Sequence, residues 1–196
     1  MAKISSTAIR RLQAESRRVK ADGLSIGFYA FPTPNLREFD DVTWEIYIKG
    51  TDNSVYEGTY LHARIKFPME YPIHPPTLVF VTEMFHPNIY SDGKVCISIL
   101  HVADDDPTSY ETPDEKWTPV QCINTIVLSV ISILNEPNVD SPANVDASKM
   151  LNEEKNKYEA YVRKLAQEKG TKFEDIKLNE IPNDDQLYIR KLFNKH

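Results

Sequence analysis

Residues 42–67 read VTWEIYIKGTDNSVYEGTYLHARIKF, and this stretch decides the fold class. Within residues 42–49 and 60–67, one set of apolar side chains alternates with a mostly polar set. A period of two puts each set on its own face of a strand, which predicts an antiparallel sheet covered on one side. Turn-forming residues between Gly50 and Ser54 separate the two strands.

The flanking segments extend this sheet. Residues 24–30 alternate in the same way and predict a first strand, while residues 77–82 predict a fourth that completes a short meander. Ser5 or Ser6 can cap a preceding helix that we expect to run to about Lys20. Its apolar or small seam consists of Ile9, Leu12, Ser16 and Val19.

Beyond the sheet, ten of the thirteen prolines lie between Pro68 and Pro142, which predicts ordered loops, a usual place for a functional site. Thr118 and Pro119 suit the N-cap and first turn of a buried central helix that ends near Leu134. A later helical pattern runs from about Ala147 to Gly170.

The predicted organisation is α+β, with one domain over residues 1–168 and a C-terminal extension over 169–196. A short helix is expected to start near residues 181–184 of the extension. Two readings of the extension stay open: it packs back on the domain, or it recruits a partner.

Composition excludes several classes of protein. The chain has 196 residues, a net charge of −6 and 41% hydrophobic residues, which excludes disorder throughout. Two cysteines exclude a disulfide framework and a four-cysteine zinc site. The longest apolar stretch, residues 123–134, is about half the ~20 residues of a membrane helix. With no signal-peptide core near the N-terminus, we expect a cytoplasmic or nuclear protein without a membrane partner.

Charge is distributed unevenly along the chain. Residues 1–20 carry six cations and one acid, whereas residues 103–116 carry six acids and one cation. Opposite charges on separate segments predict protein partners that are steered electrostatically. Because the basic run lacks interleaved aromatic residues, no nucleic-acid partner is expected.

The chemistry converges on residues 86–98, HPNIYSDGKVCIS. A cysteine among apolar neighbours is usually a small buried hydrophobe. The turn at Ser91–Gly93 before Cys96, and the charged loop after it, instead place the thiol at a rim. Asn88 offers an amide donor that suits an oxyanion.

Two competing kinds of site can be weighed here. A Cys-His protease is the obvious competitor, but His86 stands before a proline at a turn-building position. A metal site is not expected, because its candidate ligands lack paired spacing. Those candidates are His86, Cys96, His101 and Cys122.

His86-Pro87-Asn88, followed eight residues later by Cys96, resembles the signature of ubiquitin-conjugating enzymes. Further matching segments, in the family's order, are Tyr56-Glu57-Gly58, Phe67-Pro68, Tyr71-Pro72-Ile73-His74-Pro75-Pro76, Trp117-Thr118-Pro119 and Leu134-Asn135-Glu136-Pro137-Asn138. The resemblance covers roughly residues 6–166. It implies the ubiquitin-conjugating fold: a four-stranded antiparallel meander with an N-terminal helix, a central buried helix and C-terminal helices.

The resemblance also implies a mechanism without a cofactor, because ATP is spent upstream. Cys96 would accept ubiquitin as a thioester from the activating enzyme and pass it to a lysine amine. Asn88 would stabilise the oxyanion directly or by ordering its loop, and His86 would hold the turn through hydrogen bonds. The other residues expected to organise the site are Pro87, Tyr90, Ser98, Asp140 and Ser141.

Cys96 and Trp117 are 21 residues apart, which resembles an insertion at residues 103–116. Serine at 98 and 141, where many members have aspartate, agrees with a subclass similar to the cell-cycle enzymes that work with cullin-RING ligases and extend chains. We expect acids of this loop to attract and orient the acceptor's basic surface: Asp104, Asp105, Asp106 and Glu111.

The implied partners are ubiquitin, the activating enzyme and a RING-type ligase, with the cullin type among the candidates. The residues expected to contact the ligase or activating enzyme are Arg10, Arg11, Ile73, Pro75, Pro76, Thr118, Pro119 and Val120. Residues 166–196 hold six acids and six bases, which does not suit docking on a basic cullin surface. The alternatives are a carrier of another ubiquitin-like modifier, an inactive ubiquitin-binding relative, and a scaffold that works through its tail.

Overall fold

The computed structural model describes residues 5–33, 42–102 and 115–195. Its elements, in chain order, are α1 (Ser6–Ile26), β1 (Phe28–Pro32), β2 (Val42–Lys49), β3 (Tyr60–Phe67), β4 (Thr77–Phe80), the 3-10 turn η1 (Ser98–Leu100), α2 (Ile123–Asn135), α3 (Val145–Glu153), α4 (Lys155–Lys169), the 3-10 turns η3 (Phe173–Asp175) and η4 (Leu178–Glu180), and α5 (Asn183–Leu192). Among the helices described, none is long and apolar enough to cross a bilayer.

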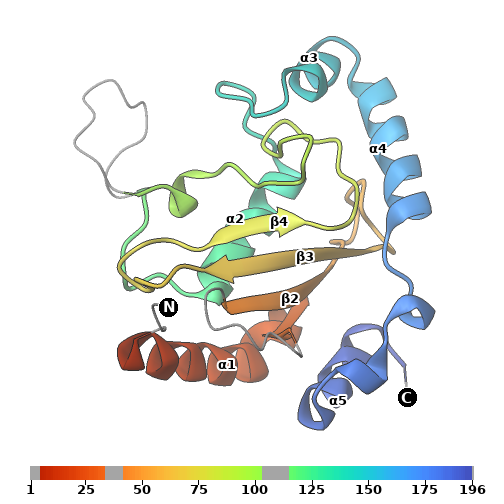
Figure 1. Ribbon diagram of the computed structural model, residues 1–196. Helices are drawn as coiled ribbons and strands as arrows, with labels where there is room; N and C mark the ends of the chain where they lie inside the picture. The colour runs from red at the N-terminus through yellow and green to blue at the C-terminus, as the bar shows by residue number, and fades with distance from the viewer. Residues whose placement is uncertain (1–4, 34–41, 103–114, 196) are drawn as a thin grey trace.

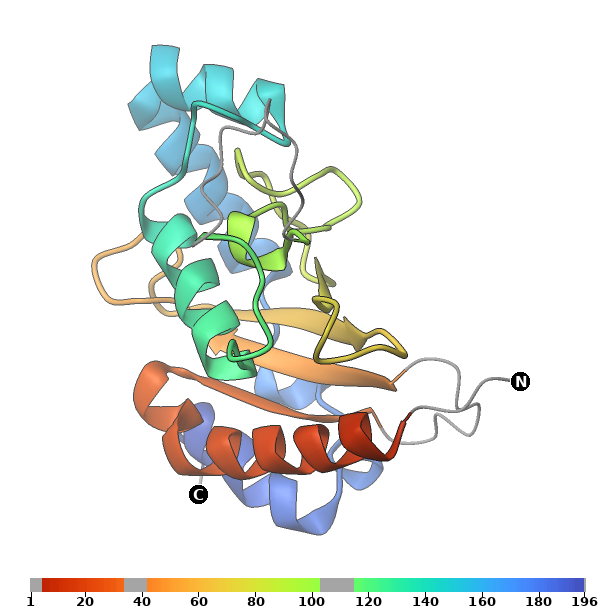
Figure 2. The same ribbon diagram turned by 90° about the vertical axis from the view of Figure 1, so that its left-hand side faces the viewer.

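Strands β1 to β4 pair antiparallel in chain order, which confirms the predicted meander (Figure 1). The register pairs Trp44 with Ile65 and Ile46 with Ala63, so the apolar set of each strand shares one face. Helix α2 lies against that face, and α1 runs along the β1 edge (Figure 2). The centre of α2 is fully buried at Ile126, Val127 and Val130. The α+β fold is therefore the expected one.

Helix α1 is longer than predicted, because residues 24–26 form its last turn rather than the start of a strand. Gly27 ends the helix with a φ of 99°, a left-handed conformation that glycine adopts without steric cost. The expected seam is also partly wrong: Ala8 and Glu15 are fully buried, whereas Ile9 is 46% exposed. A three-residue alternation could not distinguish a helix end from a strand.

The helices that follow the sheet differ from the prediction at two places: the start of α2, and a break between α3 and α4. Helix α2 begins at Ile123, not at Thr118, because residues 118–121 form a turn closed by the Gln121 amide on the Thr118 carbonyl. The predicted helix over residues 147–170 is two helices, α3 and α4, with a break at Glu154, whose φ and ψ are −138° and 53°. Single-sequence periodicity runs through such a break, since both halves bury residues at helical spacing.

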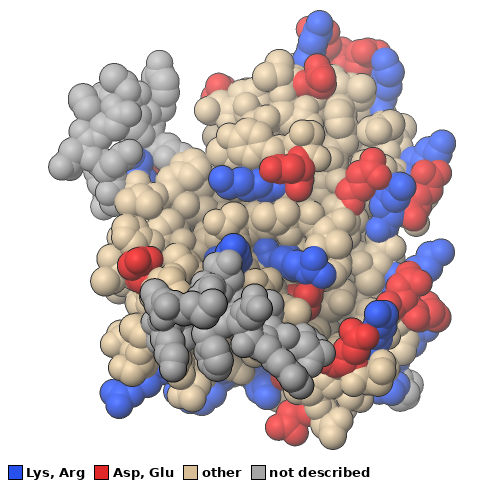
Figure 3. All heavy atoms as spheres, viewed as in Figure 1, with Lys and Arg blue, Asp and Glu red and all other residues tan. Residues whose placement is uncertain are grey.

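The extension packs back on the domain and covers the outer face of β1 and β2. The ring of Tyr188 stacks on Tyr29 with centroids 4.8 Å apart, and the Tyr29 hydroxyl donates to Asp185 at 2.6 Å. Phe193 stacks on Tyr60 at 3.9 Å. The expectation of a sheet covered on one side is therefore wrong at β1 and β2. On the surface that includes α4 and the extension, acidic and basic side chains are interspersed (Figure 3).

Candidate functional site

The cysteine segment is fixed by backbone hydrogen bonds on both sides. The Cys96 amide donates to the Asn88 carbonyl at 3.0 Å, and the neighbouring Val95 amide donates to the Leu78 carbonyl of β4 at 2.9 Å. Gly93 turns the chain with a φ of 86°, and a Cβ there would lie 2.3 Å from the Phe80 carbonyl oxygen. Only glycine lets the turn approach β4 this closely, so it sets the position of the thiol.

His86 and Asn88 build the loop beneath this segment. The backbone amide of Asn88 donates to Nδ1 of His86 at 3.0 Å. Nε2 of His86 therefore carries the ring proton and donates it to the Ile133 carbonyl of α2 at 2.8 Å. Burial lowers the pKa of His86 to about 4, outweighing the opposing effect of that hydrogen bond. The imidazole is therefore neutral and holds the turn through hydrogen bonds.

The side chain of Asn88 is 3% exposed and fully engaged with residue 138. Its amide nitrogen donates to the Asn138 carbonyl at 2.8 Å, and its Oδ1 accepts from the Asn138 backbone amide at 2.9 Å. Because both polar ends hold the 138 segment, the geometry favours the second of the two roles expected for Asn88, the ordering of its loop.

Cys96 opens into a cavity of about 170 Å³ whose lining includes Pro75, Lys94 and Leu100. This volume is below the ~300–1,000 Å³ of ordinary ligand pockets, so it suits a narrow chain end and one incoming side chain. The Tyr90 hydroxyl approaches the Cys96 Sγ at 3.7 Å, and Nε2 of His101 lies 3.6 Å from the same sulfur. The hydrogen bond to Cys96 raises the pKa of Tyr90.

His101 was considered from the sequence only as a metal ligand and was set aside, yet it lies beside the thiol. It is five positions after Cys96, and the 3-10 turn η1 between them brings both side chains to the same cavity. Residues 97–100 are apolar apart from one serine and look like a continuing strand, so periodicity gave no sign of the turn. A polar residue directly after such a run was the available signal.

Three further residues expected at the site are Ser98, Asp140 and Ser141. Ser98 begins η1, and Asp140 and Ser141 lie exposed on the segment after α2. That segment is tied to the site at Pro87, whose carbonyl accepts from the Asn144 amide at 2.9 Å. The acids Asp104, Asp105, Asp106 and Glu111 lie outside the described residues.

The two expected contact loops are exposed at their tips. Ile73 is 69% exposed and Val120 is 81% exposed, whereas Pro76 is buried. The loops are joined by the Trp117 indole, which donates to the Pro72 carbonyl at 2.9 Å. The two loops therefore lie beside each other, and Arg11 of α1 donates to the second of them at the Pro119 carbonyl.

Arg11 differs from the expectation, because its guanidinium is bound within the chain. It donates to the Pro119 carbonyl at 2.8 Å, to the Gln121 carbonyl, and to Glu15 at 2.6 Å. Arg10 is exposed and keeps the outward position expected for a contact residue.

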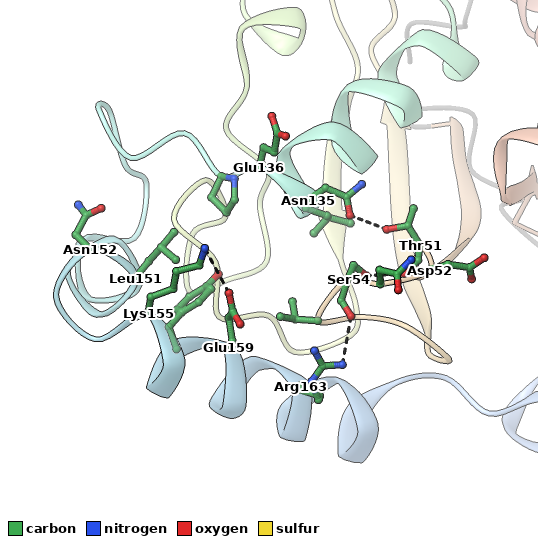
Figure 4. Close-up of a pocket in the computed structure, with 15 residues that line it drawn as sticks. Thr51, Asp52, Ser54, Asn135, Glu136, Leu151, Asn152, Lys155, Glu159 and Arg163 are labelled. Atoms are coloured by element: carbon green, nitrogen blue, oxygen red, sulfur yellow. Dashed lines mark hydrogen bonds and ion pairs between the residues drawn. The ribbon is translucent and has the colours of Figure 1, made fainter.

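A larger cavity, of about 760 Å³, lies apart from the thiol, between the β2–β3 loop, the C-terminal end of α2 and helices α3 and α4 (Figure 4). The hydroxyl of Thr51 donates to Asn135 at 2.6 Å across it, and Arg163 donates to the Ser54 carbonyl at 3.3 Å. Lys155 and Glu159 pair at 3.7 Å on its α4 wall. Charges of both signs line it, so it favours no single ligand charge.

Residues 11–166 match the family model described as ubiquitin-conjugating enzyme. The chain is 48% identical over 159 residues to "Ubiquitin-conjugating enzyme E2-18 kDa" of Schizosaccharomyces pombe, covering 81% of this chain and 93% of that protein. It is 42% identical over 164 residues to "Ubiquitin-conjugating enzyme E2 G2" of Homo sapiens, covering 84% and 97% of the two chains. Among the described residues, no cluster of three or more His, Cys, Asp or Glu side chains could hold a metal ion. Fold, loop geometry and these similarities agree, and the chain belongs to the ubiquitin-conjugating enzyme family.

Proposed function

We propose that Cys96 is the thiol on which this ubiquitin transferase carries ubiquitin as a thioester, before passing it to a lysine amine. The observation that supports the assignment is the placement of the thiol. Cys96 is half-buried at the mouth of a small cavity, on a hairpin fixed by Asn88 and Gly93. The other cysteine, Cys122, is the N-cap residue of α2 and does not line that cavity.

A non-reducing gel tests the assignment directly. The protein is mixed with activating enzyme, ATP and ubiquitin, beside the variants Cys96→Ala and Cys122→Ala. We expect a band shifted by one ubiquitin that added thiol removes and that only Cys96→Ala lacks. No band from the folded wild type, beside a working control carrier, would contradict the assignment and point to another ubiquitin-like modifier or to a scaffold.

We further propose that the acidic loop recruits the acceptor. A lysine amine has an ordinary pKa of about 10.4, and nearby carboxylates raise it, so this loop does not act by deprotonating the acceptor. Asp104, Asp105 and Asp106 can instead attract the basic surface of the acceptor, while Tyr90 and the apolar rim remove water from the amine. We propose that this recruitment serves chain extension on ubiquitin itself, with a RING-type ligase.

The loop is tested by replacing Asp104, Asp105 and Asp106 with Asn. We expect the acceptor concentration needed for chain assembly to rise, while thioester formation on Cys96 is unchanged. A matched control neutralises three acids of α3 and α4, Glu153, Glu159 and Glu168, and should leave both steps unaltered. Loss of thioester formation in the loop variant would refute recruitment. The cullin type of ligase stays a prediction, and the balanced charge of the extension gives it no support.

A further inference from the structure

The Cys96 cavity contains a histidine, His101, that lies outside the motif of residues 86–96. Nε2 of His101 lies 3.6 Å from the Cys96 sulfur, and both residues line the cavity. The backbone of His101 is fixed on both sides: its amide donates to the Ser98 carbonyl at 2.9 Å, and its carbonyl accepts from the Trp117 amide at 2.9 Å. The backbone bonds to η1 and to Trp117 therefore hold the imidazole beside the thiol.

We propose that His101 is a further catalytic residue of the transfer reaction, which moves the proton that each step must relocate. The inference rests on the proposed role of Cys96. A histidine suits the task because imidazole changes protonation near neutral pH, and because it lies close to the reacting atom. The distance lies within the range of hydrogen bonds to sulfur, so the proton can pass directly between the two groups.

The protons balance in both steps. During charging, Nε2 takes the thiol proton while Sγ attacks the thioester carbon on the activating enzyme; the new carbon–sulfur bond forms, the old one breaks, and the departing thiolate receives the proton. During transfer, the neutral acceptor amine attacks the thioester carbon on Cys96. The carbon–nitrogen bond forms, the surplus nitrogen proton passes to Nε2, the carbon–sulfur bond breaks, and the imidazolium returns the proton to Sγ. His101 ends each step unchanged.

The other titratable groups at the site are less suited to the task. Both ring nitrogens of His86 are used within the fold, and burial lowers its pKa to about 4. Tyr90 is a phenol whose pKa is raised further, so it does not accept a proton near neutrality. Lys94 also lines the cavity, and Glu115 and Lys116 lie in the segment beside residues 101 and 102. Each of them adds to the local field, but only His101 and Tyr90 contact the sulfur among the interactions described.

The test is ligase-free discharge of the preformed ubiquitin thioester to free lysine, after charging has been stopped with a magnesium chelator. The variants are His101→Gln, His101→Asn and His101→Ala, with His74→Gln, an exposed histidine, as the control. We expect the His101 variants to discharge about 10- to 100-fold more slowly near pH 7. The difference in discharge rate between the wild type and the His101 variants should narrow towards pH 9, where hydroxide and neutral amine are more abundant. Free imidazole should restore His101→Ala and leave the wild type unchanged.

A second measurement uses the wild-type chain, so that it does not depend on the folding of a variant. Alkylation by iodoacetamide is followed across pH at each cysteine by peptide mapping, with Cys122 as the internal control. A titrating neighbour should give Cys96 a two-step pH profile, beside a single step at Cys122. A single step at both cysteines would overturn the inference.

The discharge assay has its own refuting results. Rates within twofold of the wild type in the His101 variants, or an equal loss at every pH without imidazole rescue, would reject the proton-transfer role. If the wild type does not charge at all, it is the proposed function that has failed. If it charges, and the His101 variants discharge normally, only this inference has failed.

Discussion

Glu15 is a buried carboxylate of α1 that bonds to three other residues of the fold. The variant Glu15→Gln tests how much these bonds contribute to the stability of the protein. The carboxylate has no exposed surface. Its Oε1 accepts from Arg11 at 2.6 Å and from the Tyr71 hydroxyl at 3.0 Å, and its Oε2 accepts from the Ile123 amide at 3.1 Å. A glutamine keeps the shape but replaces one of these acceptors with a donor.

The expected cost follows from those contacts. One hydrogen bond to a charged acceptor is worth about 1.5–3 kcal/mol, and breaking a buried ion pair costs about 3–5 kcal/mol. Because the glutamine oxygen still accepts on one side, we expect the low end of the second range, about 3 kcal/mol. For a chain of this size that is a fall in Tm of roughly 6–12 °C.

Thermal unfolding followed by tryptophan fluorescence measures this effect, since Trp44 and Trp117 are both buried. The matched control is Glu159→Gln, which removes a partly exposed pairing with Lys155 on α4 and should cost under about 1 kcal/mol. A fall in Tm of less than about 2 °C for Glu15→Gln would refute the claim that this carboxylate stabilises the packing of α1 against Tyr71 and the start of α2.

Two further predictions concern pH and the extension. Burial lowers the pKa of His86 to about 4, below the ~6.5 of an unfolded chain, so its stabilising contribution is complete above pH ~6.5 and is lost as the pH falls towards 4. We expect about 2–3 kcal/mol of stability to disappear over that range, and His86→Gln to flatten this part of the pH dependence in urea titrations. Ile189→Ala should lower the free energy of unfolding by about 2–4 kcal/mol, because the side chain is fully buried where the extension meets the domain. Leu187→Ala, at a position 54% exposed on the same helix, should cost well under half as much in the same denaturation assay.

The sheet could be predicted closely from the sequence, because its inner face is read directly from alternation. Strands β2 and β3 begin and end where the pattern in residues 42–67 does. The outer face could not be predicted, since its burial comes from α5, more than a hundred residues away. Tyr29 and Tyr47 lie on this outer face, where Tyr188 stacks on Tyr29 and Phe193 meets Tyr47 edge to face.

In the candidate site, too, the features set by local sequence could be predicted, and those set by distant contacts could not. Cys96 and Asn88 could be found because both lie in one local motif, whose hydrogen bonds are short-range in sequence. The partner of Asn88, residue 138, comes from beyond the central helix, so no local pattern indicated that the amide is fully engaged. The place of His101 beside the thiol could not be predicted for a different reason: a single 3-10 turn changes which residues meet, and it has no hydrophobic period of its own.

The neighbouring arginines of α1 show why residue type alone does not assign a contact. Arg10 and Arg11 were expected to meet partners together, yet only Arg10 is exposed. Removing Arg11 from the fold would break its bonds to two loop carbonyls and leave the buried Glu15 with Arg18, at 3.9 Å, in place of an ion pair at 2.6 Å. Weakening a buried ion pair in this way costs more than an exposed ion pair returns. Arg11 therefore holds the 118–121 loop against α1. A partner that binds α1 through Arg10 would therefore contact a helix whose position relative to the 118–121 loop is already fixed by Arg11.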